Sequence, residues 1–169
     1  MLFDRFKQVK AFVFDVDGVL SDGNVLVTER GEQLRVFNIK DGYAIQLAVN
    51  KGYPVAIITG GTSIGVKKRM EALGITDVYL GVHDKAAILH DWLSRNQLQA
   101  TDILYMGDDV PDLESMKAVG VPTCPGDAVE AIKAVSVYIS PRNGGDGAVR
   151  DVIEKVMKLQ YTWSENNSY

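Results

Sequence analysis

Two short segments, DVDG at residues 15–18 and GDDVPD at residues 107–112, each place carboxylates directly after an apolar run. The aspartates are Asp15, Asp17, Asp108, Asp109 and Asp112. Two like charges about 4 Å apart repel by about 4 kcal/mol at an effective dielectric constant near 20. Carboxylates that meet therefore need raised pKa values or a divalent cation. Because these segments offer oxygen ligands and neither histidine nor thiolate, the cation that suits them is Mg²⁺.

A hydroxyl and a lysine elsewhere in the chain could bind an anion beside such a cation. Thr59 ends the apolar run VAIIT and precedes Gly60, and Lys85 begins a helical pattern. A lysine at a helix N-terminus, a threonine hydroxyl and free backbone amides bind a phosphoryl group well. Taken singly, each feature has an ordinary interpretation as a turn former, a strand-to-helix turn or a surface lysine. Their joint occurrence in this order favours one site over unrelated loops.

The elements that must position these residues alternate between strands and helices. Apolar runs predict strands at 11–16, 54–59, 77–82, 102–106, 121–124 and 137–140. Helical patterns cover 43–50, 64–73, 85–96, 113–119, 128–134 and about 148–160, with N-caps at Asp41, Ser63, Asp84 and Asp127 and C-caps at Gly52 and Gly74. Continuous apolar strands are buried on both faces, which predicts an α/β fold: a three-layer, Rossmann-like, mostly parallel sheet flanked by helices.

Ligands bind such a sheet at the C-terminal ends of its strands, where the loops meet. The first strand delivers Asp15 and Asp17 to this edge, and the second delivers Thr59. The third leads into Lys85, and the fourth ends at Asp108. We therefore expect all of them on one edge of the sheet. Asp22, which follows a short loop, is expected to shape the chain rather than take part in chemistry.

Bulk composition narrows the class of protein. With 169 residues, 46% of them hydrophobic, the chain is expected to fold as one domain over residues 1–169. A net charge of -4 does not favour nucleic-acid binding, and no apolar run approaches the roughly 20 residues of a membrane helix. The single cysteine, Cys124, and a charged N-terminus without a secretory signal predict the cytoplasm.

The segment NVLVTERGEQLRVFNI, within residues 24–40, is predicted to form a β-hairpin inserted after the first strand, with its turn at Glu29–Gly31. The return strand places Leu34 and Val36 on one face and Phe37 and Ile39 near the other. A lone two-stranded ribbon with apolar faces is marginal in water, so it needs a surface to pack on. We expect a neighbouring subunit there, in an oligomer in which one chain closes the pocket of another. The polar tail, 161–169, is expected to fray or to dock on a partner.

The segments DVDGVLSDG, IITG and GDDVPD, together with Lys85, resemble the four motifs of the haloacid-dehalogenase superfamily of phosphohydrolases. The resemblance implies that Asp15 is the nucleophile, forming an aspartyl-phosphate, and that Asp17 is the general acid and then the general base. It also implies that Mg²⁺ binds Asp15, the Asp17 carbonyl and Asp108. The resemblance implies supporting roles for the remaining motif residues. Asp109 and Asp112 would hold the metal ligands in place, and the phosphate would be bound by Thr59, Gly60 and Lys85.

Superfamily members often carry a cap domain, but the interval from Thr59 to Lys85 holds only a helix and a strand, so no large cap fits there. The segments GEQLRVFNIKDG and RNGGDGAVR resemble the capless, tetrameric subgroup of the superfamily. The resemblance implies a homotetramer with shared active sites that hydrolyses a phosphorylated sugar acid, 3-deoxy-D-manno-octulosonate 8-phosphate, in lipopolysaccharide biosynthesis. Arg69 matches an arginine of the family and would bind the sugar carboxylate; on local pattern alone it is equally a solvated residue beside Lys67 and Lys68.

The resemblance places Gly61 at the rim of the pocket as a substrate-binding position, and there it leaves the substrate open. Octulosonate phosphatases typically carry an arginine at this position, and a related nine-carbon enzyme carries an acidic residue. The alternatives are therefore a phosphatase for a nine-carbon, sialic-acid-type 9-phosphate and a broad small-molecule phosphatase. A dehalogenase needs neither Asp17 nor the second acidic segment. A signalling receiver module carries its acidic metal ligands before the threonine and lysine, whereas Asp108 and Asp109 come last here. A catalytically silent module is disfavoured because Asp15 is present.

Overall fold

The structure is a computed structural model that describes residues 1–164. Of the predicted tail at 161–169, residues 165–169 lie outside the described residues. Among the described residues, no helix is long and apolar enough to cross a membrane.

A six-stranded sheet forms the centre of the molecule, in the order β5-β4-β1-β6-β7-β8, with every neighbouring pair parallel. The strands are β1 (Ala11–Phe14), β4 (Val55–Ile58), β5 (Asp77–Tyr79), β6 (Ile103–Met106), β7 (Val121–Cys124) and β8 (Tyr138–Ile139). From β1 the chain builds outward through β4 and β5 and then crosses to the other side for β6. The C-terminal end of β1 therefore lies at a switch point of the sheet, which is where ligands bind in this class of fold. The predicted parallel α/β architecture is confirmed.

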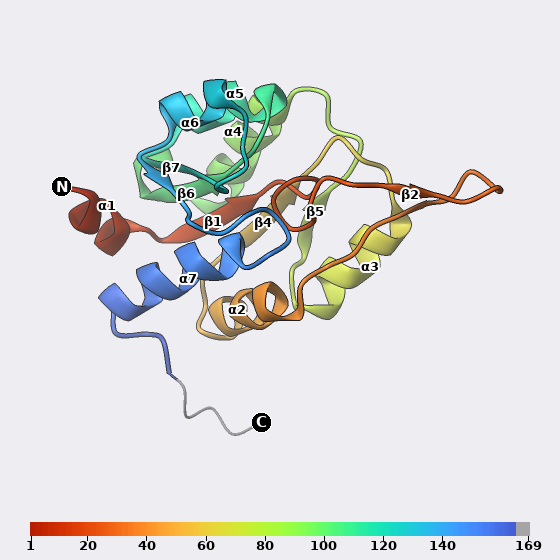
Figure 1. The fold of residues 1–169 in the computed structure, drawn as a ribbon. Coiled ribbons are helices and arrows are strands. Elements are labelled where there is room, and N and C mark those ends of the chain that lie inside the picture. Colours follow the sequence, from red (N-terminus) through yellow and green to blue (C-terminus); the bar gives the residue numbers. More distant parts are fainter. Residues whose placement is uncertain (165–169) are drawn as a thin grey trace.

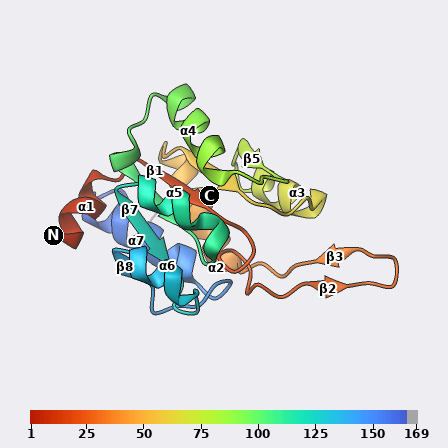
Figure 2. The ribbon, with the colours of Figure 1, turned by 90° about the horizontal axis from the view of Figure 1, so that it is seen from above.

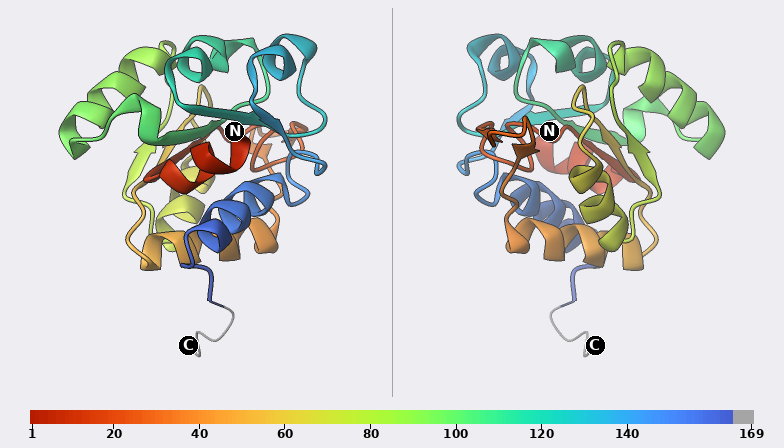
Figure 3. Two further views of the ribbon diagram at one scale, coloured as in Figure 1. Left: turned by 90° about the vertical axis from the view of Figure 1, so that its left-hand side faces the viewer. Right: turned by 90° about the vertical axis from the view of Figure 1, so that its right-hand side faces the viewer.

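Helices cover both faces of this sheet and complete the three layers (Figures 1 and 3). On one face lie α1 (Leu2–Gln8), α2 (Ile39–Asn50), α3 (Ile64–Ala72) and α7 (Ala148–Leu159), and on the other lie α4 (Lys85–Asn96), α5 (Leu113–Ala118) and α6 (Glu130–Val135). Short 3-10 helices occupy Ala100–Asp102 and Val110–Asp112. Successive residues of β1 alternate between the two cores, Phe12 and Phe14 in one and Ala11 and Val13 in the other, so β1 is buried on both sides.

The predicted hairpin is present as β2 (Leu26–Val27) paired antiparallel with β3 (Gln33–Leu34). Figure 2 shows it projecting away from the body of the molecule. Leu26 and Val36 are 67% and 82% exposed, so the hairpin carries apolar side chains into solvent. No cap domain is present among the described residues, and the interval between β4 and α4 contains only α3 and β5, as predicted.

The start of α2 corrects two predictions. The helix begins at Ile39, so this residue is not part of the return strand. Its N-cap is Asn38, whose side chain accepts hydrogen bonds from the amides of Lys40 and Asp41. Asp41, predicted as the cap, is buried and instead accepts from the amides of Gly147 and Arg150 at the start of α7. A helix start that is remote in sequence satisfies this carboxylate, which no local pattern reveals.

Other helix ends divide between confirmed and wrong predictions. Ser63 and Asp84 cap α3 and α4 as expected. Asp127 does not cap α6, which starts at Glu130; its carboxylate accepts from the amide of Gly144 instead. Helix α1 was not predicted from the sequence, because its short amphipathic pattern presents few apolar positions; Phe6 alone is buried within it.

Candidate active site

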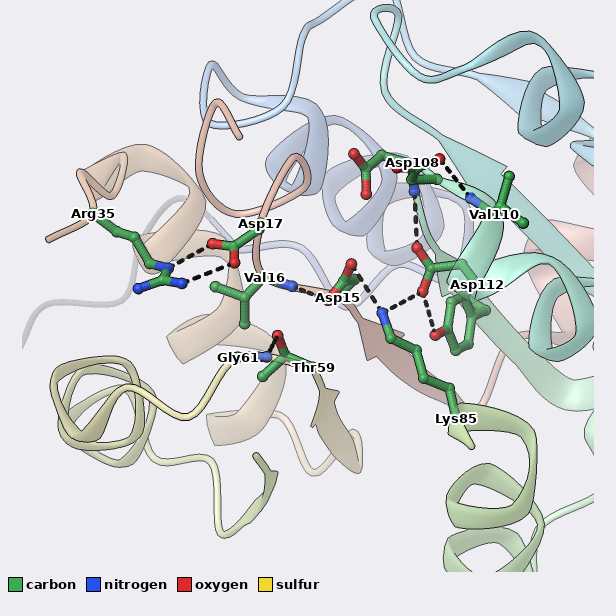
Figure 4. Close-up of polar contacts among 12 residues, drawn as sticks. Asp15, Val16, Asp17, Arg35, Thr59, Gly61, Lys85, Asp108, Val110 and Asp112 are labelled. Atoms are coloured by element: carbon green, nitrogen blue, oxygen red, sulfur yellow. Dashed lines mark hydrogen bonds and ion pairs between the residues drawn. The ribbon is translucent and has the colours of Figure 1, made fainter. Parts of the chain in front are cut away.

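A pocket of about 500 Å³ opens at the C-terminal edge of the sheet, where β1, β4 and β6 end. Its lining includes nearly all the predicted site residues, namely Asp15, Asp17, Thr59, Gly60, Gly61, Lys85, Asp108, Asp109 and Asp112. Figure 4 shows how most of these side chains converge. The sequence segments that carry them are separated by up to about ninety residues, and the parallel sheet brings them together.

Asp15 and Lys85 form a buried ion pair in the floor of the pocket. The Lys85 Nζ lies 3.0 Å from Asp15 Oδ2 and 2.8 Å from Asp112 Oδ1. The other oxygen of Asp15 accepts a hydrogen bond of 2.7 Å from the amide of Val16. Asp15 and Lys85 are 7% and 5% exposed, and charges buried this deeply persist only when they are paired. The nucleophile predicted from the sequence is thus held in one orientation.

Asp112 is a support for this pair. Besides Lys85, its carboxylate accepts from the Tyr105 hydroxyl at 2.8 Å and from the Asp108 amide at 3.1 Å. Tyr105 was missed by the sequence analysis. The available signal was its hydroxyl in an otherwise apolar strand, because a buried tyrosine hydroxyl normally finds a partner. With its oxygens occupied by these donors, Asp112 is suited to orient its neighbours, which is the supporting role predicted for it.

Asp108 faces Asp15 across the pocket, and carboxylate oxygens of Asp15, Asp108 and Asp112 all lie within 4.8 Å of one another. Gly18 makes room for this approach. Its φ is +82°, and a β-carbon there would overlap the Asp108 carboxylate. Asp109 points elsewhere: its carboxylate accepts from the amide of Val110 and caps the short helix at 110–112. It therefore shapes the loop that presents Asp108.

Electrostatics at this cluster favour a bound cation. Burial, with the neighbouring charge of Asp112, raises the pKa of Asp15 to about 7 against the opposing effect of Lys85. Burial, with the charges of Asp112 and Asp109, likewise raises the pKa of Asp108 to about 7. For Lys85, burial lowers the pKa, but the carboxylates of Asp15 and Asp112 outweigh it and leave the pKa above its ordinary value. Carboxylates that resist ionisation together, with no histidine or thiolate among them, fit a hard divalent cation such as Mg²⁺.

The turn after β4 forms the opposite wall. Thr59 is buried, and its Oγ1 accepts a hydrogen bond of 3.2 Å from the amide of Gly61. This contact folds the Thr59–Gly61 turn back toward the pocket (Figure 4). The turn offers a hydroxyl and backbone amides on the side facing Asp17, in the place where the sequence analysis expected phosphate-binding groups.

Asp17 has a partner that the sequence analysis did not identify. Arg35, which directly follows β3 of the hairpin, donates from Nε to Asp17 Oδ1 at 2.6 Å and from Nη2 to Oδ2 at 3.0 Å. The signal was present in the predicted alternation: Leu34 and Val36 share one face of the return strand, so Arg35 points to the other. What lies on that other side is fixed by the fold.

Arg69 is the one predicted site residue that does not line this pocket. Its guanidinium packs on α2, so close that a β-carbon at Gly42 would lie 2.6 Å from its Nη2. Within one chain it is a contact between α3 and α2, and its role in binding a sugar carboxylate stays a prediction.

A larger hollow of about 660 Å³ lies beside α7 and is lined by charged residues. Many of these charges pair with one another, as in the contacts Arg150–Glu154 at 3.0 Å and Lys158–Glu154 at 2.6 Å. It lacks the convergence of strand ends that builds the Asp15 pocket. We therefore place the chemistry at the smaller pocket.

A parallel sheet with two aspartates after its central strand, a buried lysine and a second acidic loop defines the class: a Rossmann-like α/β protein of the kind that the resemblance to phosphohydrolases predicted. Comparison with known proteins specifies the family. Residues 41–125 match the family described as "Haloacid dehalogenase-like hydrolase". The chain is 35% identical over 159 residues to the 3-deoxy-D-manno-octulosonate 8-phosphate phosphatase of Yersinia pestis, covering 94% of this chain and 85% of that protein.

Solved structures give the same result. The octulosonate 8-phosphate phosphatase of Moraxella catarrhalis, in complex with magnesium ion, phosphate ion and the sugar acid, is 35% identical, with a TM-score of 0.92 over 95% of this chain and 92% of that chain. A cobalt-bound phosphatase from Haemophilus influenzae is 28% identical, with a TM-score of 0.91 over 97% and 96%. The chain therefore belongs to the haloacid dehalogenase-like hydrolases, and it is a phosphatase of that family related to the octulosonate 8-phosphate enzymes.

Proposed function

We propose that this protein is a Mg²⁺-dependent phosphomonoesterase that hydrolyses 3-deoxy-D-manno-octulosonate 8-phosphate to the free sugar acid and phosphate, in lipopolysaccharide biosynthesis. The observation that carries the proposal is the orientation of Asp15, whose carboxylate is buried at the pocket floor between Lys85 and the amide of Val16. Similarity to phosphatases of this substrate over nearly the whole chain supports the choice of ester.

The proposed chemistry assigns a role to each of the main residues that line the pocket. An oxygen of Asp15 forms the new O–P bond as the bond from phosphorus to the sugar oxygen breaks. Asp17, two residues further on, gives a proton to the departing oxygen. In the second step Asp17 takes a proton from water, whose oxygen attacks phosphorus and releases Asp15. Lys85 and the Thr59–Gly61 turn stabilise the charge on the transferring oxygens.

The bound cation would neutralise phosphate charge and position the ester. Asp15, Asp108 and the Asp17 carbonyl are proposed as its protein ligands, with Asp112 and Asp109 holding the ligands in place. The carboxylates of Asp15 and Asp108 have the oxygen chemistry and the proximity that this role needs.

Assembly is the second part of the proposal. The pocket is open to solvent, and the apolar hairpin residues Leu26 and Val36 are 67% and 82% exposed, with Ile39 at the start of α2 78% exposed. A ribbon with this much exposed apolar surface is stabilised by packing on another protein surface. We propose that four copies associate through their hairpins and that each chain helps to close a neighbour's pocket. Light scattering of the purified protein should give the mass of a tetramer, and a monomer would contradict the shared pocket.

The deciding experiment is turnover with added Mg²⁺ of the octulosonate 8-phosphate, a nine-carbon sialic-acid-type 9-phosphate and hexose 6-phosphates. We expect the octulosonate ester to have the highest kcat/KM, and chelation of the metal to stop its hydrolysis. A preference for the nine-carbon ester would move the assignment to that substrate. Equal rates on all esters would indicate a broad phosphatase.

A further inference from the structure

Arg35 reaches the catalytic pocket from an element outside the sheet. Its side chain is only 6% exposed, although the hairpin that carries it projects into solvent. Nε and Nη2 hold the two oxygens of Asp17, while Nη1 donates to the backbone carbonyl of Gln33 at 3.2 Å. The guanidinium is thus anchored at one end on the hairpin and engaged at the other with a predicted catalytic residue.

Asp17 depends on this contact for its orientation. Its side chain is 35% exposed at the pocket rim, and within residues 1–164 the hydrogen bonds to its carboxylate come from Arg35 alone. Asp15, by comparison, is fixed by both Lys85 and the amide of Val16. A two-point guanidinium–carboxylate contact fixes direction as well as position, which a single ammonium contact does not.

Gly61 lies beside the guanidinium, where a β-carbon would fit only in direct contact with it. A β-carbon at this position would lie 3.4 Å from Arg35 Nη2 and 3.7 Å from Asp17 Oδ2. A larger side chain there would compete with Arg35 for the same volume. Oδ2 is also the Asp17 oxygen in the longer of the two contacts and the one that faces the Thr59–Gly61 turn. It is therefore the oxygen placed toward the proposed phosphate position.

We propose that Arg35 is a positioning residue that holds Asp17 in the orientation from which Oδ2 exchanges a proton with the leaving group and with water. The proposal rests on the proposed function, because Arg35 acts only through the acid and base role given there to Asp17. It also makes the hairpin part of the catalytic machinery within its own chain, apart from any contact that the hairpin makes with a second copy.

The first test compares leaving groups. Departure of an alkoxide requires a proton from Asp17, whereas p-nitrophenolate leaves without one. In Arg35→Ala we expect kcat on the alkyl ester octulosonate 8-phosphate to fall about tenfold or more. The burst of p-nitrophenolate from p-nitrophenyl phosphate, which reports the first step, should change less than about threefold. Arg35→Lys keeps the charge but not the two-point contact, so its kcat on the alkyl ester should fall nearly as far as that of Arg35→Ala.

Arg30→Ala is the matched control, since it removes the same side chain type from the tip of the same hairpin. Arg30→Ala should leave the kcat on the alkyl ester and the p-nitrophenolate burst unchanged. Equal losses on both substrates in Arg35→Ala would overturn the proposal and make Arg35 a residue for phosphate binding or for folding; no loss on either would also overturn it.

The second test is a double-mutant cycle on the alkyl ester with Asp17→Asn. If Arg35 acts through Asp17, adding Arg35→Ala to Asp17→Asn should cost no further activity. Losses that multiply would contradict the proposal. Circular dichroism and light scattering of each variant report folding and assembly. Failure of the proposed function is distinguishable, because it would appear as activity that survives Asp15→Asn in a protein whose Arg35 is intact.

Discussion

The candidate catalytic edge of the sheet, where Asp15, Lys85 and Asp112 lie, and the hairpin are stabilised in opposite ways. At the edge, the buried polar groups of Asp15, Lys85 and Asp112 satisfy one another through short hydrogen bonds. In the hairpin, two strands of two residues each expose apolar side chains such as Leu26 and Val36. One region has its interaction partners within the fold, and the other presents surface that a partner would cover.

Under the proposed function, this difference assigns chemistry to one region and assembly to the other. Charges buried at the edge require a rigid frame, because a lost partner leaves an uncompensated charge. The hairpin needs no internal partners of that kind, since under the proposed assembly its apolar face packs on a second copy. Arg35 is the exception that joins the two regions, because it lies on the hairpin and holds Asp17.

The largest difference between the two regions is expected when the proposed nucleophile is removed, and it should appear in activity and not in folding. Asp15→Asn removes the attacking carboxylate, and kcat should fall by about 10⁴-fold or more. Asp22→Asn is the control, because Asp22 accepts from the amide of Asn24 in the loop toward the hairpin and an asparagine can still accept there. It should keep wild-type turnover. Steady-state kinetics with circular dichroism checks both, and substantial turnover by Asp15→Asn would refute the aspartate mechanism.

Two glycines with positive φ, one in each region, extend the contrast. Gly18, at φ +82°, borders Asp108, whereas a β-carbon at Gly31, at φ +79° in the hairpin turn, would meet no atom of the described residues within 4 Å. Alanine at either site adds about 1–2 kcal/mol of backbone strain. Gly18→Ala should in addition displace Asp108 and reduce kcat by about 100-fold. Gly31→Ala should only lower the free energy of unfolding. Similar kcat values for Gly18→Ala and Gly31→Ala would show that the position of Asp108 does not depend on its close contact with Gly18.

The acidity of the edge gives a pH dependence that the hairpin lacks. The pKa values of Asp15 and Asp108 are raised to about 7 in the folded chain. Between about pH 4 and 7 the folded chain therefore keeps protons on these two carboxyl groups that the unfolded chain has released. This contribution to stability is complete below about pH 4 and is lost as the pH rises through 7, by up to about 1.4 kcal/mol per pH unit for each group.

Mg²⁺ should reverse this trend, because the cation favours the ionised carboxylates. Urea unfolding at pH 5, 6, 7 and 8 should show a stabilisation by Mg²⁺ that grows with pH. Asp108→Asn should reduce both the pH slope without metal and the stabilisation with it. A Mg²⁺ effect that is independent of pH would place the ion elsewhere.

The weakest effect on the fold itself is expected in the hairpin. Val36 is 82% exposed, so Val36→Asp should change the free energy of unfolding of the isolated chain by only about 0.5 kcal/mol. The same substitution puts a charge into the proposed contact between copies, and light scattering should detect a smaller species with reduced activity. Glu29→Gln in the hairpin turn serves as the control. A Val36→Asp protein of unchanged mass and turnover would remove the hairpin from the assembly.

Much of the catalytic edge could be predicted from the sequence. Continuous apolar runs predicted a parallel sheet, and a parallel sheet brings the ends of its strands to one edge. Asp15, Thr59, Lys85 and Asp108 could therefore be placed together from the sequence, because strand spacing is a local property of the chain. The hairpin was predicted for the same reason, since alternation and a turn signal are both local.

The partner that each side chain meets was settled by tertiary packing. Asp41 was predicted to cap its own helix but accepts from the amide of Arg150, more than a hundred residues away. Tertiary packing likewise brings the hydroxyl of Tyr105 to Asp112 and the guanidinium of Arg35 to Asp17. It also packs Arg69 on α2 instead of in the pocket lining. Local pattern fixes the face on which a side chain lies. What occupies the space opposite that face depends on how remote elements pack. For Arg35, that packing places a hairpin residue in contact with Asp17, the proposed general acid.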